Sequence, residues 1–161
     1  MKLTNIKDSS FEMNVKSYES PDIINDEYDS NWLNINLKVK GLKKPWQVTD
    51  NCLLNWEILE LIHWLEDIMI NKENNKKIYF IEPNLRFVKT KKTIDNAYIR
   101  IYFELEARPK WAVSNVAGQD DLWIDLTPSK NELRNAIMDL KKQLRKYPIR
   151  GNKKFLKRFK I

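Results

Sequence analysis

The sequence predicts an α+β protein with a mainly antiparallel β-sheet of about six or seven strands and two amphipathic helices packed on it. One long segment has apolar residues at three- and four-residue spacing, as in an amphipathic helix. The segments on both sides of it alternate between apolar and polar residues, as in half-buried strands. All six prolines fall between the elements predicted in this way. We expect a single domain over residues 1–149 and a basic tail over residues 150–161.

The helical pattern covers residues 50–71 and is the longest in the chain. Its apolar positions form one stripe on a helix, and the positions between them form a mostly acidic outer face. Thr49 and Asp50 supply oxygens that could cap the first turn. The stripe contains Leu54, Ile58, Leu61, Ile62, Leu65, Ile68 and Met69, and the outer face contains Glu57, Glu60, His63, Glu66 and Asp67.

The remaining elements are predicted from shorter patterns. Ser129 and Glu132 have the spacing of a capping box, and Pro128 is suited to the same helix start. A second amphipathic helix therefore begins there and ends at Tyr147, before Pro148. The predicted strands cover residues 11–18, 31–40, 46–49, 78–81, 85–90, 98–106 and 122–126.

Composition limits the possible environment of the protein. The single cysteine, Cys52, excludes an internal disulfide, and its apolar neighbours favour a small buried hydrophobe over a nucleophile. A chain without disulfides is compatible with a reducing cytoplasm. No apolar run resembles a signal peptide or a membrane span. We expect a soluble cytoplasmic protein without membrane insertion.

Catalytic patterns are missing from the sequence. His63 is the only histidine, and Glu60 and Asp67 at helical spacing from it favour a surface ion pair over a general base. Walker, Rossmann and zinc-ligand patterns are absent, and three glycines provide no phosphate-binding loop. We therefore expect no catalytic residues, no metal site and no cofactor, and a protein that is not an enzyme.

Two charged segments are candidates for binding. Residues 19–29 contain five acids and no Lys or Arg, which is typical either of a solvated loop or of a contact surface for a basic partner. Residues 150–161 contain six cations and no acid, so only +1 of the net charge of +7 belongs to the rest of the chain. This tail could pack on the domain or be a disordered extension, which is the favoured interpretation, or it could bind nucleic acid with stacking from its phenylalanines or lie on an anionic membrane.

Five segments have a distinctive sequence: DEYDSNWLNINLKVKG (26–41), PWQVTDNCLLNWEILELIHWLEDI (45–68), IYFIEPNLRF (78–87), IYFELEARPKW (101–111) and LKKQLRKYPIRG (140–151). Together and in this order they resemble the WapI-type immunity proteins of Gram-positive bacteria. The resemblance implies a small cytoplasmic protein that binds and neutralises the C-terminal domain of a cognate polymorphic or contact-dependent toxin, often a nuclease. It brings no catalytic motif with it.

The residue-level expectations follow from charge and aromatic character. Nuclease toxins present basic surfaces to nucleic acid, so acids are candidate contacts, and exposed tryptophans are common at interfaces. The candidates for toxin binding are Asp22, Asp26, Glu27, Asp29, Trp32, Glu57, Glu60, Glu66 and Trp111. The alternative is a nucleic-acid-binding protein that acts through Arg150, Lys153, Lys154, Lys157, Arg158 and Lys160.

Overall fold

The computed structural model describes residues 1–5, 8–72, 77–92, 96–112 and 121–159. Within these ranges the chain is α+β with antiparallel strands, as predicted, but the strands form two four-stranded sheets rather than one sheet. The first sheet, in spatial order, contains β1 (Lys2–Thr4), β2 (Ser10–Tyr18), β3 (Trp32–Lys40) and β4 (Trp46–Leu54). The second contains β5 (Lys77–Tyr79), β6 (Leu85–Lys92), β7 (Ala97–Phe103) and β8 (Leu122–Leu126).

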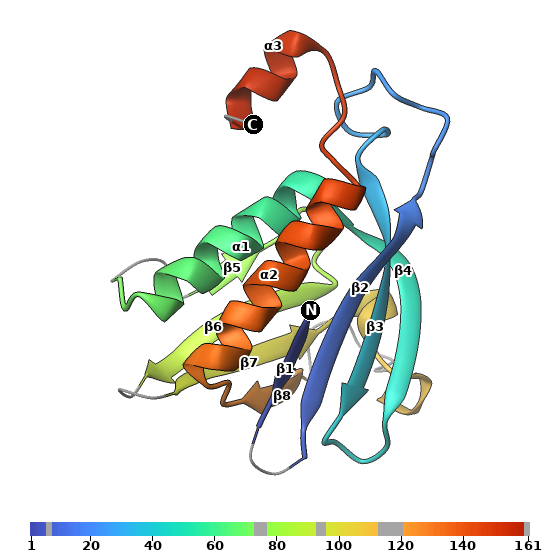
Figure 1. Cartoon of the computed structure of the whole chain (residues 1–161). Coiled ribbons are helices and arrows are strands. Elements are labelled where there is room, and N and C mark those ends of the chain that lie inside the picture. Colours follow the sequence, from blue (N-terminus) through green and yellow to red (C-terminus); the bar gives the residue numbers. More distant parts are fainter. Residues whose placement is uncertain (6–7, 73–76, 93–95, 113–120, 160–161) are drawn as a thin grey trace.

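Two long helices lie side by side against the sheets (Figure 1). Helix α1 (Asn55–Met69) connects the two sheets in the sequence, and α2 (Lys130–Lys146) follows the second sheet. A short third helix, α3 (Lys153–Leu156), was not predicted. Three 3-10 turns are also present in the described ranges, at Leu105–Ala107, Lys110–Ala112 and Lys157–Phe159. No helix in the described residues is long and apolar enough to cross a membrane.

The predicted start of the first helix is wrong. Residues 50–54 continue β4, because they pair with β3 as far as the Trp32–Leu54 register position. Helix α1 therefore begins at Asn55, and Thr49 and Asp50 lie in the strand and do not cap it. The Glu57 carboxylate caps the helix instead, accepting a hydrogen bond from the backbone N–H of Leu54 at 2.8 Å. The capping box of α2 is confirmed, with the Glu132 N–H donating to Ser129 Oγ at 3.3 Å.

The main core lies between the helices and the inner faces of both sheets. Phe11 of the first sheet meets Phe87 of the second edge to face, with ring centres 5.7 Å apart, so the sheets share one core. Strand β7 alternates regularly, with its apolar side chains inward and Tyr98, Arg100 and Tyr102 on the other face. Cys52 is buried in this core, as predicted.

A second, smaller cluster lies at the end of the molecule where α1 begins. Its buried members are Leu54, Trp56, Ile149 and Phe155. Figure 1 shows α3 at this end, where the long β2–β3 connection also lies. Segments from the start, middle and end of the chain therefore meet there.

Candidate functional site

The candidate site is the loop of residues 19–29 between β2 and β3, called the acidic loop below, together with the chain that packs beside it. The described residues hold no group of three or more His, Cys, Asp or Glu side chains placed to bind a metal ion. His63 lies exposed on α1. Burial raises the pKa of the Cys52 thiol to about 12, which makes it a poor nucleophile.

Hydrogen bonds within the acidic loop fix the shape of its second half. One carboxylate oxygen of Asp26 accepts hydrogen bonds from the backbone N–H groups of Tyr28 and Asp29, both at 2.7 Å. The Ser30 hydroxyl donates to the carbonyl of Asp26, and the Asn31 N–H donates to the carbonyl of Tyr28 at 2.8 Å. Asp26 therefore has a structural role in the loop.

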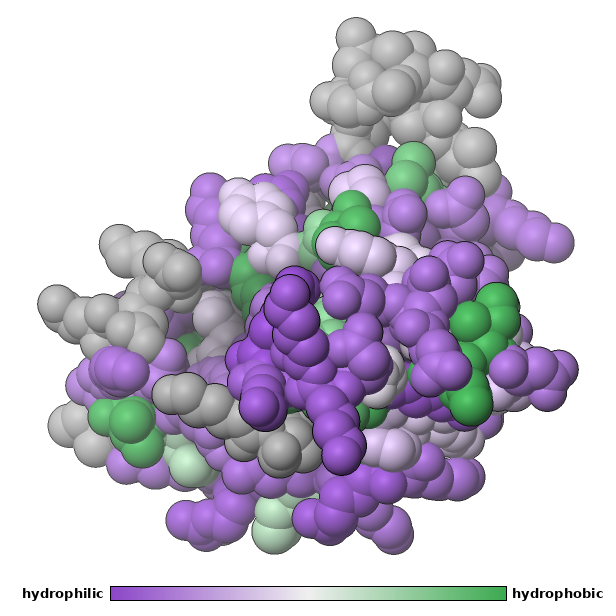
Figure 2. Space-filling view, turned by 90° about the horizontal axis from the view of Figure 1, so that it is seen from above, coloured by the Kyte–Doolittle hydropathy of each residue, from purple (hydrophilic) through white to green (hydrophobic). Residues whose placement is uncertain are grey.

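The acidic loop displays apolar side chains among its carboxylates. Ile23, Ile24 and Tyr28 are 40%, 58% and 54% exposed. Asp22 and Asp29 are also exposed. Large apolar side chains next to charged groups are typical of the core and rim of protein interfaces. Figure 2 views this end of the molecule and shows a mostly hydrophilic surface with a few separate apolar patches.

The tail is folded onto the domain as far as it is described. Phe155 is 4% exposed and packs edge to face on Trp56, with ring centres 5.5 Å apart. Phe159 stacks on the same indole at 5.8 Å, and Tyr28 of the acidic loop meets it at 5.6 Å. Trp56 thus joins the acidic loop to residues 149–159, called the C-terminal segment below. Because Phe155 is buried here, it offers no free face for stacking on a base.

The cations of the tail fall into two groups. Arg150 donates hydrogen bonds from Nη1 to the carbonyls of Pro21 and Ile23 at 2.9 and 3.1 Å. Arg158 lies 3.4 Å from the Glu27 carboxylate, an exposed ion pair of small energetic weight. Lys153, Lys154 and Lys157 are exposed. Lys160 lies outside the described residues.

The interior position of Glu57 contradicts its assignment to the outer face of the helix. Glu57 is 2% exposed, and its second oxygen accepts a hydrogen bond from the backbone N–H of Ile81 at 2.6 Å. Burial raises its pKa to about 7, against the lowering effect of the hydrogen bonds from the Leu54 and Ile81 backbones. A carboxylate enclosed in this way contacts the protein's own backbone, so Glu57 is not a surface candidate.

The other two helix candidates do lie at the surface. Glu60 is exposed, and partial burial raises its pKa while the nearby charge of His63 opposes that shift. Glu66 is half-buried and pairs with Lys141 of α2 at 2.6 Å, so it links the two helices. This pairing leaves Glu66 less free to meet a partner than the acids of the loop.

The two candidate tryptophans lie at opposite ends of the β3–β4 pair. Trp32 is half-buried and packs on the small cluster beside the acidic loop. Trp111 packs edge to face on Trp46, with ring centres 5.9 Å apart, at the other end of β4. Nine residues of strand separate these ends by about 26–30 Å. Trp111 therefore does not belong to the surface around the acidic loop.

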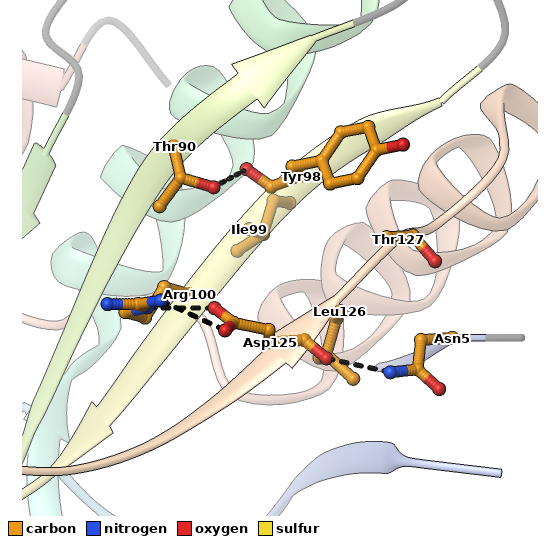
Figure 3. Close-up of a pocket in the computed structure, with 8 residues that line it drawn as sticks. All are labelled: Asn5, Thr90, Tyr98, Ile99, Arg100, Asp125, Leu126 and Thr127. Carbon is orange, nitrogen blue, oxygen red and sulfur yellow. Dashed lines mark hydrogen bonds and ion pairs between the residues drawn. The ribbon is translucent and has the colours of Figure 1, made fainter. Parts of the chain in front are cut away.

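A hollow of about 410 Å³ on the second sheet is one concave alternative among the described residues (Figure 3). The Arg100 guanidinium donates to both carboxylate oxygens of Asp125, at 2.8 and 3.0 Å, and Asn5 donates to the Asp125 carbonyl at 2.9 Å. The other lining residues are Thr90, Tyr98, Ile99, Leu126 and Thr127. Its charges neutralise each other, and the lining contains no nucleophile paired with a base, so it does not have the composition of an active site.

A comparison with protein families identifies the chain. The model of the immunity protein WapI-like family matches residues 2–148. This protein belongs to that family. The relationship indicates a toxin immunity protein, in agreement with the resemblance seen in the sequence. No curated protein and no solved structure matches the chain significantly.

The family match covers only part of the candidate site. In this WapI-like protein the acidic loop and Trp56 lie inside the matched region, whereas the C-terminal segment, residues 149–159, follows it. Sequence reasoning found the acids of the loop. It missed the exposed Ile23, Ile24 and Tyr28, although the position of these apolar residues among five acids indicates that they lie in an exposed loop.

Proposed function

We propose that this protein binds the toxin domain encoded next to its own gene and neutralises it by covering the toxin's active or substrate-binding surface. The acidic loop supplies the contact, and the toxin is a nuclease whose basic, phosphate-binding surface faces that loop. The interaction takes place in the cytoplasm, where the toxin would otherwise act in contact-dependent inhibition. The protein itself performs no catalysis.

One observation carries this proposal: three exposed apolar side chains lie among the carboxylates of a loop with a fixed shape. The apolar groups Ile23, Ile24 and Tyr28 provide contact area, and Asp22 and Asp29 provide charge that complements a basic surface. A loop that is already ordered loses less conformational entropy on binding than a flexible one. Trp32 and Glu60 are candidates for the edge of the same contact.

Nucleic-acid binding through the tail has less support. Phe155 is buried, and Arg150 and Arg158 bind the acidic loop. We therefore do not propose this alternative.

Growth rescue with charge variants tests the proposal. The protein is co-expressed with the toxin domain as wild type or as the double variant Asp22→Asn and Asp29→Asn. We expect the wild type to rescue growth. With the purified proteins at low salt, we expect the loop variant to associate with the toxin domain roughly tenfold more slowly than the wild type, because charge at an interface mainly accelerates association.

A matched control makes the same charge change elsewhere. Asp121 and Asp125 are 59% and 55% exposed beside the second sheet, and both are changed to Asn. The control should associate like the wild type. Equal effects of the loop and control variants would rule out the acidic loop as the contact.

A further inference from the structure

The C-terminal segment follows the residues matched by the family model, although its first three residues belong to the family-like sequence 140–151. It contacts the acidic loop directly at two residues, Arg150 and Arg158. Arg150 contacts the start of the loop, and Arg158 lies beside Glu27. Phe155 and Phe159 pack on Trp56, which also contacts Tyr28. A part of the chain that follows the matched residues therefore borders the surface that we assign to toxin binding.

Arg150 holds the first half of the loop by a geometry that requires a guanidinium. Its Cζ atom lies 3.3 Å from the centre of the Tyr18 ring, and its Nη1 donates to the carbonyls of Pro21 and Ile23. These carbonyls flank the exposed side chains of Asp22 and Ile23. A lysine ammonium is a point charge that cannot stack on the ring and hold two carbonyls in the same way.

Backbone hydrogen bonds of the same residue hold the end of the loop. The Arg150 N–H donates to the Asn31 side-chain oxygen at 2.8 Å, and the Asn31 amide donates to the Arg150 carbonyl at 2.9 Å. Asn31 is fully buried. Arg150 therefore connects the first half of the acidic loop, which its side chain contacts, to Asn31 just after the loop, which its backbone contacts.

The exposed face of the C-terminal segment carries charge of the opposite sign to the loop. Lys153, Lys154 and Lys157 are exposed, while Phe155 between them is buried. Within the described chain no carboxylate forms an ion pair with these three lysines. The acidic loop and the segment thus form one surface with a negative and a positive side.

We propose that the C-terminal segment is a specificity-determining part of the toxin-binding surface. Arg150 is a positioning residue that holds the acidic loop in its binding conformation. The three lysines contact carboxylates on the toxin, whose surface is basic opposite the loop and acidic opposite α3. This inference rests on the proposed function and adds a requirement for the toxin. A toxin with a basic surface opposite the loop but no acidic surface opposite α3 would bind less tightly.

Full-length Arg150 variants test the positioning role. Affinity for the purified toxin domain is measured by calorimetry, and amide hydrogen exchange is followed in the loop and in β6–β7. Arg150→Ala should bind roughly tenfold or more weakly and exchange faster at residues 19–23, the part of the loop that the lost side chain holds, with β6–β7 unchanged, because disordering a loop adds an entropic cost to binding. Arg150→Lys should fall between Arg150→Ala and the wild type.

Unchanged affinity of Arg150→Ala, measured with a protein whose β6–β7 protection matches the wild type, would overturn the positioning role. Faster exchange in β6–β7 would mean a general loss of stability. In that case the affinity of Arg150→Lys for the toxin domain tests the positioning role, because this role predicts weaker binding even when the charge and the stability are kept.

Charge reversal tests the contact made by the lysines. The variant Lys153→Glu, Lys154→Glu and Lys157→Glu should lose roughly tenfold or more in affinity, since like charges would then face each other across the interface. The matched control reverses three exposed cations at the far end of the sheet, Lys40 at the end of β3 and Lys43 and Lys44 in the β3–β4 turn. Equal affinities of the two variants would overturn the lysine contact.

Different results would contradict the proposed function and the role of the C-terminal segment. If the wild-type protein does not bind the toxin domain, the proposed function is wrong. If the wild type binds and the Arg150 and lysine variants bind equally well, only the role of the C-terminal segment is wrong.

Discussion

Tyr18 holds Arg150 and Pro148 at the same time. Its ring lies under the Arg150 guanidinium at 3.3 Å, and its hydroxyl donates a hydrogen bond to the Pro148 carbonyl at 2.6 Å. Burial raises the pKa of Tyr18 in spite of the opposing charge of Arg150, so the hydroxyl keeps its proton and remains a donor at neutral pH. The last residue of β2 thereby fixes the chain where it leaves α2 and turns toward the acidic loop.

Replacing Trp56 by alanine should destabilise the protein strongly. Trp56 is 9% exposed and contacts Tyr28, Phe155 and Phe159, so its removal leaves a cavity in the small cluster. We expect a loss of about 3–5 kcal/mol in the free energy of unfolding, measured with urea. Trp123→Ala is the control, because Trp123 is 37% exposed and should cost much less. Similar losses for the two variants would contradict the packing described for Trp56.

Glu57 should make the wild-type protein less stable as pH rises. Its pKa is about 7 in the folded protein, whereas the ordinary value for a glutamate is 4.5. Between pH 4.5 and pH 7 the folded state therefore holds a proton that the unfolded state has released. Wild-type stability relative to Glu57→Gln, which cannot titrate, should therefore fall by about 3 kcal/mol from pH 4.5 to pH 7 and then level off.

Urea unfolding of both proteins across this pH range measures the Glu57 effect. The comparison is necessary because Glu12, Glu132 and Asp139 have lowered pKa values in the folded state, which act in the opposite direction as pH falls. Taking the difference between the two proteins cancels these contributions. A difference that does not change with pH would show that Glu57 titrates normally.

Cys52 should be unreactive until the protein unfolds. It is 1% exposed, and burial raises its pKa to about 12, so neither access nor thiolate is available near neutral pH. Iodoacetamide at pH 8 should label the protein rapidly in urea and very slowly in buffer, as read by mass spectrometry. Labelling of the folded protein at the rate of a free thiol would be inconsistent with this burial.

Gly41→Ala should destabilise the β3–β4 turn. Gly41 has φ +108°, and a Cβ added there would lie 2.1 Å from Ser9 Oγ. Backbone strain of this kind costs about 1–3 kcal/mol, and the steric contact adds to it. Lys43→Ala in the same exposed turn should change the free energy of unfolding by less than about 0.5 kcal/mol. Thermal or urea unfolding of both variants distinguishes the two results.

Local patterns predicted much of the fold. Alternation identified β2, β3 and β7, because one face of each strand is buried. Strands were also predicted at β6 and β8, whereas β1 was not predicted. The capping box identified the start of α2, since all its groups lie within four residues. The start of α1 was missed because residues 50–54 fit the helical stripe as well as the strand. Pairing with β3, a non-local contact, decides in favour of the strand.

The division into two sheets and the burial of Glu57 depend on contacts between distant segments. Helical spacing places Glu57 between the apolar positions, but the Ile81 backbone closes over its carboxylate from another part of the chain. The acids of the loop could be found in the sequence as a run of charge. Their support by Arg150 and Asn31 could not, because those residues come together only in the folded chain.

The most direct test of the account is binding between the purified protein and the purified toxin domain encoded immediately upstream of its gene. Size-exclusion chromatography and calorimetry follow the complex, and a nuclease assay follows the activity of the toxin. We predict a stable complex in which the toxin no longer cleaves its substrate, with affinity lowered by the loss of Asp22 and Asp29. No complex, or a complex in which the toxin stays fully active, would contradict the proposed neutralisation.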